Sequence, residues 1–243
     1  MYENEKNVQT GNLVKLVGTV LSKRIVSDEL ISLRLAVSSS TEENGYCSVY
    51  VYFYGKDAIA KIDSAIADHS RARVEVLGFV QTSKRIREID GEKETHYYQD
   101  VVGISIAFAQ NVLERMLDAY GVGRIKADSV NRFVCFGKVV SIFSYGGGRG
   151  RFNYITVKTW HNHYANFPQL ICHSIATDRI VQELNKGDYI IATGEICSGE
   201  NHSLTRKHKA LLYISDLQKI EDPETAKMAQ PTLDSSDIIF SAI

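Results

Sequence analysis

Hydrophobic and polar residues alternate with a period of two through most of the first half of the chain. This alternation is typical of β-strands that have one buried face. It predicts five strands, at residues 13–21, 31–37, 46–54, 73–80 and 100–108. Between the third and fourth strands, in residues 55–70, apolar residues recur at steps of three and four, which predicts an amphipathic helix.

The second half of the chain repeats this order of elements. Strands are predicted at residues 131–142, 151–160, 167–175, 188–196 and 210–220, with a helix at 177–184 between the third and fourth. Self-similarity at a spacing of about 115 residues indicates a duplicated domain.

Five strands with a helix between the third and fourth are typical of the OB fold, a barrel that binds oligonucleotides on a shallow face. We therefore predict an all-β protein with short helices, built from two tandem OB-fold five-stranded Greek-key barrels. The predicted parts are a first domain at 8–110, a linker at 111–129, a second domain at 130–220 and an acidic disordered tail at 221–243.

Charge is distributed unevenly along the 243 residues, although the net charge is only −1. The segment 221–243 carries −4 and residues 1–6 carry −1, which leaves +4 on residues 7–220. A mildly basic body favours an anionic partner. The polar first residues, and an apolar stretch at 101–109 that is too short to cross a bilayer, lead us to expect a cytoplasmic protein with no membrane contact.

Residues with recognisable chemistry do not form a catalytic or metal-binding pattern. The four cysteines lie far apart without CxxC spacing, so we expect buried thiols in a reducing compartment: Cys47, Cys135, Cys172 and Cys197. Paired carboxylates, a nucleophile elbow and a phosphate loop are not recognisable, so we expect no cofactor, no metal and no enzymatic activity.

Ordered segments of the first repeat resemble the bacterial single-stranded DNA-binding protein (SSB) family over residues 12–109. The segments that carry this resemblance are Asn12–Gly18, Leu33–Val37, Tyr54–Ala58, Gly78–Thr82 and Asp100–Val102. The second repeat resembles the family less closely, at residues 131–139, 185–188 and 193–195. The resemblance implies the two-OB-fold type of SSB, a homodimer with four barrels, and a nucleoid-associated location.

Binding of a single strand needs aromatic faces for the bases and cations for the phosphates. Tyr50, Tyr52 and Tyr54 alternate with apolar residues and share one face of a predicted strand. One face of this strand must be core, and we expect the tyrosine face to be the DNA platform, with Phe79 extending it. The resemblance places Tyr54 at a base-stacking position of the family, and His173 takes the corresponding position in the second repeat.

Further candidate contacts lie in basic segments that contain aromatic residues. The predicted hairpin after the fourth strand contributes Lys84, Arg85, Arg87, Lys93 and Tyr97, and the glycine-rich loop of the second repeat contributes Tyr145, Arg149, Arg151 and Phe152. A solvated hairpin also needs charges, and a turn also needs glycine, so structural roles stay open. For Trp160 two roles stay open: stacking on a base, and packing against its own barrel.

The end of the tail resembles the acidic and hydrophobic tip with which the family docks replication and repair proteins. The residues concerned are Asp237, Ile238, Ile239 and Phe240, with Ile in place of the family's penultimate Pro and three residues after the Phe. We expect sequence-independent binding of single-stranded DNA in replication, recombination, repair or plasmid and phage DNA transfer. The alternatives are an OB-fold protein-interaction adaptor of the replication-restart type and an RNA-binding protein.

Overall fold

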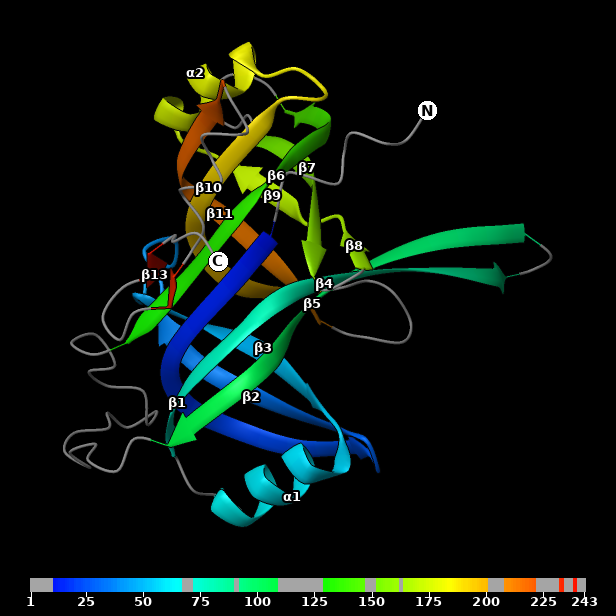
Figure 1. Ribbon diagram of the computed structural model, residues 1–243, viewed down its shortest axis with the longest axis vertical. Coiled ribbons are helices and arrows are strands. Elements are labelled where there is room, and N and C mark those ends of the chain that lie inside the picture. The colour runs from blue at the N-terminus through cyan, green and yellow to red at the C-terminus, as the bar shows by residue number, and fades with distance from the viewer. Residues whose placement is uncertain are drawn as a thin grey trace. The chain divides into compact units, whose positions relative to one another are not determined.

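The computed structural model of the chain is shown in Figure 1. The structure describes residues 11–66, 72–89, 92–108, 129–146, 152–161, 164–200, 208–221, 232–233 and 238–239. The predicted linker lies outside these ranges except for residue 129, and so do parts of the tail, including Asp237 and Phe240. The predicted domain boundaries and the disorder of the tail therefore stay predictions.

The first repeat folds into a closed five-stranded barrel, called barrel 1 here. Its elements are β1 (Gly11–Ser27), β2 (Leu30–Ser38), β3 (Tyr46–Tyr54), α1 (Lys56–Ala65), β4 (Arg73–Ile89) and β5 (Glu92–Phe108). Antiparallel pairs join β1 to β2, β2 to β3, β4 to β5 and β1 to β4, and a short parallel pair joins β3 to β5. This closed cycle of strands, with a helix after the third, confirms the predicted OB fold.

The second repeat forms barrel 2 with the same cycle of strands. Its elements are β6 (Val130–Tyr145), β7 (Phe152–His161), β8 (Tyr164–Asn166), β9 (Gln169–Cys172), α2 (Ile175–Glu183), β10 (Tyr189–Glu200) and β11 (His208–Ile220). β6 pairs with β7 and β10, β7 pairs with β9, and β9 pairs in parallel with β11, which lies next to β10. The duplicated domain predicted from the sequence is thus confirmed as a duplicated barrel.

Two elements differ from the sequence expectation. The predicted strand at 167–175 is shorter, at Gln169–Cys172, and α2 already begins at Ile175. Before it, Tyr164–Asn166 forms the unpredicted strand β8, which pairs with the end of β7. The predicted hairpin between the fourth and fifth strands is present, but its strands extend beyond the predicted ends at residues 80 and 100 and stay paired to Ile89 and Glu92. Figure 1 shows this β4–β5 arm projecting from its barrel.

Each barrel is filled by the inward-facing residues of its strands. Leu16, Ile31 and Leu33 in barrel 1, and Ile155 and Leu170 in barrel 2, are fully buried. Burying each such side chain stabilises the fold by about 1.5–3 kcal/mol. All four cysteines are buried, as expected.

Glycine marks the closest approach of β4 to β5 and of β10 to β11. A Cβ atom on Gly78 would lie 2.2 Å from the carbonyl oxygen of Val102, and one on Gly194 would lie 1.9 Å from that of Tyr213. These separations exclude any side chain, so each barrel needs glycine at this crossing.

The described residues fall into two compact units. One holds barrel 1 from Val14 onward, together with residues 129–132, 195–200 and 208–211; the other holds residues 11–13 and the remainder of barrel 2. In the first unit, Asn131 Nδ2 donates to the carbonyl oxygens of Ser38 and Ile196, both at 2.9 Å, and its Oδ1 accepts from the Ile196 N–H at 2.9 Å. This buried amide thus satisfies backbone groups of Ile196 as a neighbouring strand would.

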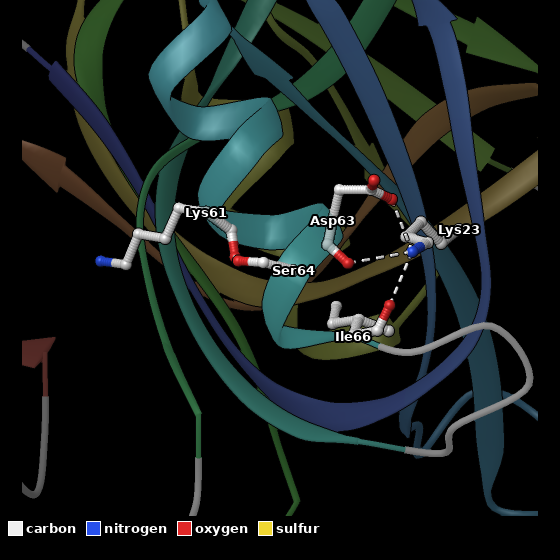
Figure 2. Close-up of polar contacts among 5 residues, drawn as sticks. All are labelled: Lys23, Lys61, Asp63, Ser64 and Ile66. Atoms are coloured by element: carbon white, nitrogen blue, oxygen red, sulfur yellow. Dashed lines mark hydrogen bonds and ion pairs between the residues drawn. The ribbon is translucent and has the colours of Figure 1, made fainter.

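A lysine of β1 caps helix α1 (Figure 2). Lys23 Nζ lies 2.6 Å from Asp63 Oδ1 and donates to the Ile66 carbonyl oxygen at 2.6 Å, while its side chain is only 11% exposed. The last carbonyl groups of a helix lack partners within the helix, and a cation there also interacts favourably with the helix dipole. Lys23 therefore fixes the end of α1 to the barrel wall.

A two-residue pairing lies within the predicted tail. β12 (Thr232–Leu233) pairs with β13 (Ile238–Ile239) in antiparallel register. The sequence showed no strand pattern there, because two-residue strands are too short to produce one.

Candidate nucleic-acid interface

The tyrosines of β3 lie on its outer face. Cys47, Val49, Val51 and Phe53 point into the core with exposures of 0–7%, whereas the tyrosines at positions 50, 52 and 54 are partly or fully exposed. Tyr54, at the end of the strand, is 50% exposed. Of the two faces of this strand, the valine face is therefore core and the tyrosine face is available to a ligand.

A cation accompanies this face. Arg34 of β2 lies directly opposite Tyr50 in the β2–β3 register, and its guanidinium carbon is 5.8 Å from the centre of the tyrosine ring. Arg34 is exposed, so its charge can reach a phosphate from beside the ring. The sequence analysis missed Arg34, since only the pairing register places it beside the tyrosines.

Phe79 continues the same row of residues, but it is largely covered. Tyr52 pairs with Val102 across the β3–β5 contact, and Val102 pairs with Phe79 on β4, so the three lie side by side. The Phe79 side chain is 9% exposed. Most of its ring therefore packs against the protein, which limits the base contact expected of it.

The pairing register of the β4–β5 arm shows which residues lie opposite the predicted basic residues on the neighbouring strand. Lys84 lies opposite Tyr97, which is 73% exposed. Arg87 lies opposite Glu94, and Lys93 lies opposite Glu88. The side chains of Arg85, Arg87 and Lys93 are outside the part that the structure describes. The register nevertheless sets an acidic residue opposite two of the predicted cations.

In barrel 2 a group of exposed aromatic residues lies on β6 and β7. Phe143 pairs with Tyr154, and Tyr145 pairs with Phe152, so four rings form two cross-strand pairs on one face, with the Ser144–Asn153 pair between them. Phe143, Tyr145 and Phe152 are 62%, 67% and 39% exposed. Tyr154 was not predicted as a site residue. Arg149 and Arg151 lie outside the described residues.

Trp160 lies at the end of β7 and is 41% exposed. Lys158 Nζ is 5.2 Å from the centre of its ring. Part of the indole is therefore packed and part is accessible, and its stacking on a base stays a prediction. The neighbouring His161 has its pKa lowered by burial, which favours the neutral imidazole.

His173 is the structural counterpart of Tyr54. Each residue immediately precedes the N-cap of the following helix, Gly55 for α1 and Ser174 for α2. The short parallel pair joins Val51 to Val101 in barrel 1 and Leu170 to Leu212 in barrel 2, which makes Gln169 and Ile171 the counterparts of Tyr50 and Tyr52. His173 is exposed and meets Tyr213 edge-on, with ring centres 5.7 Å apart. Barrel 2 thus lacks the tyrosine face of barrel 1.

The described residues offer no metal site, and two of the buried thiols are unreactive. No three His, Cys, Asp or Glu side chains within the described ranges gather closely enough to hold a metal ion. Burial raises the pKa of Cys172 to about 12 and also raises the pKa of Cys135, so both thiols stay protonated and unreactive at neutral pH. None of the described helices has the length and apolar character needed to span a membrane.

Comparison with known proteins yields matches to solved structures only. No protein-family model matches the chain, and no curated protein sequence matches it. The crystal structure of a deletion mutant of the single-stranded DNA binding protein from Thermus aquaticus superposes with a TM-score of 0.61, over 88% of this chain and 97% of that one, at 18% identity. The wild-type protein from the same organism gives a TM-score of 0.59 at 17% identity, over 88% and 95% of the two chains. The chain shares their fold. Both matches cover both barrels, so the duplication is part of the likeness.

Proposed function

We propose that the protein binds single-stranded DNA without strong sequence preference and is not an enzyme. The observation that carries the proposal is the outer face of β3, where three tyrosines lie in a row beside Arg34. Aromatic faces accept any base, and an arginine supplies both charge and a stacking plane. The shared fold with two single-stranded DNA binding proteins supports the same function.

Direct binding is the first experiment. We expect a labelled oligo-dT to bind tightly in fluorescence anisotropy, with an affinity that falls as salt rises, and a matched duplex to bind far more weakly. Equal binding of an RNA oligomer would move the function to RNA, because stacking platforms accept either sugar. Lack of binding to all three ligands would remove the proposal and favour a protein-interaction adaptor.

The assembly and its place in the cell form the finer part of the proposal. The protein acts in the cytoplasm, in association with the nucleoid, as a homodimer with four barrels that serves replication, recombination, repair or plasmid and phage DNA transfer. A monomer mass in sedimentation analysis would contradict the dimer. The residues Asp237, Ile238, Ile239 and Phe240 dock replication and repair proteins, and equal recovery of those proteins by a chain without residues 238–243 would contradict this role.

A further inference from the structure

A row of two lysines and two aromatic residues crosses the outer face of barrel 2. Tyr189 of β10 lies opposite Lys138 of β6, and Lys138 lies opposite Lys158 of β7. Directly paired residues point to the same side of a sheet. Trp160 lies two residues beyond Lys158 on β7, and therefore also on this side. The four residues thus occupy three neighbouring strands of one face.

The inward neighbours confirm which side this is. Ile155, Val157 and Thr159 of β7 and Ile190 of β10 are each 0% exposed. Lys138, Lys158 and Tyr189 are of intermediate exposure, and Trp160 is exposed. The row is therefore reachable from outside the barrel.

Each lysine lies near one of the rings. Lys138 Nζ is 6.0 Å from the centre of the Tyr189 ring, and Lys158 Nζ is 5.2 Å from that of Trp160. Tyr189, Lys138 and Lys158 thus follow one another across three strands, and Trp160 lies two residues along β7 from Lys158, so that a ring lies beside each lysine. Two cations directly opposite each other on neighbouring strands repel, and a phosphate between them would be attracted to both. A ring at either end then offers a face to the base on each side of that phosphate.

The geometry points to a second single-strand surface, formed by Lys138, Lys158, Tyr189 and Trp160, which holds a phosphate at its centre and stacks a base at each end. This inference rests on the proposed function and assigns barrel 2 a contact surface that lies farther along β6 and β7, on the same outer face as the β6–β7 aromatic pairs. Barrel 1 has no such row, because the register places Thr19 and Ala36 at the positions of the two lysines.

The test combines charge removal with the protein's single tryptophan as a reporter. In the double variant Lys138→Gln/Lys158→Gln, the slope of log affinity for oligo-dT against log salt should fall by about 0.7, the contribution of the one phosphate that the two lysines no longer neutralise. The matched control is Lys56→Gln/Lys61→Gln, which removes the same charge from exposed positions of α1. Its slope should stay that of the unmodified protein.

Trp160 emission is the independent readout. It should be quenched as oligo-dT saturates the unmodified protein, and Trp160→Ala should weaken binding by about 5- to 150-fold, the effect of removing one stacked base. If oligo-dT binds but leaves the emission unchanged, and the slope of the double variant equals that of its control, this surface is wrong while the proposed function stands. If the unmodified protein binds no single strand, the proposed function fails first.

Discussion

Barrel 1 and barrel 2 have the same strand cycle, but their outer surfaces differ. Gly78 and Gly194 occupy matching crossings, and the short parallel contacts Val51–Val101 and Leu170–Leu212 close both barrels in the same way. The tyrosines of β3, in contrast, have Gln169, Ile171 and His173 as counterparts. Barrel 2 instead carries two cross-strand pairs of aromatic residues on β6 and β7. The comparison shows that the two barrels close through the same strand pairs although their exposed aromatic residues lie on different strands.

The largest expected effect tests the buried cores, which the two barrels have in common. Leu33 and Ile155 are counterparts that are both fully buried. Leu33→Ala and Ile155→Ala should each lower the free energy of unfolding by about 2–5 kcal/mol, because each leaves a cavity in a closed core. Urea denaturation followed by circular dichroism measures the change. A decrease below about 1 kcal/mol at either site would show that the two cores are not packed alike.

The next largest expected effect tests the outer faces, in which the two barrels differ. Tyr54→Ala should weaken oligo-dT binding by about 1–3 kcal/mol, since it removes an exposed stacking ring. His173→Ala should have a smaller effect, because its ring is smaller and already contacts Tyr213. Anisotropy titration compares the two variants, with Tyr54→Phe as the control that keeps the ring. Equal weakening at the two positions would make the two barrels equivalent in binding.

The smallest effect concerns the helices that follow β3 and β9. Lys23→Met should cost about 1 kcal/mol of stability by removing the cation from the end of α1 while keeping the aliphatic stem. In barrel 2 the cap lies at the other end, where Ser174 Oγ accepts from the Thr177 N–H, and Ser174→Ala should also cost about 1 kcal/mol. Thermal unfolding measures both. An unchanged melting temperature for Lys23→Met would show that its contacts with Asp63 and Ile66 add no stability.

The hydrophobic pattern predicted the strand order of both barrels because each strand has one buried face. It did not predict the β4–β5 arm beyond residue 80, since a two-stranded arm buries little and is held by backbone hydrogen bonds that leave no mark on the pattern. The three residues of β8 are too few to show a period.

The candidate site was predictable only where its residues are close in sequence. Tyr50, Tyr52 and Tyr54 share one strand, so their alternation was enough to place them on one face. Lys138, Lys158 and Tyr189 come from three strands, and only the pairing register brings them together. Arg34 was missed for the same reason.

The β4–β5 arm sets a length scale for whatever binds barrel 1. From Lys84–Tyr97 to Ile89–Glu92 the two strands form six residue pairs beyond the buried Tyr98, a reach of about 20 Å at about 3.4 Å per residue. An oligonucleotide of a few bases can therefore occupy the tyrosines of β3 without touching the tip of the arm, whereas a longer one can contact both.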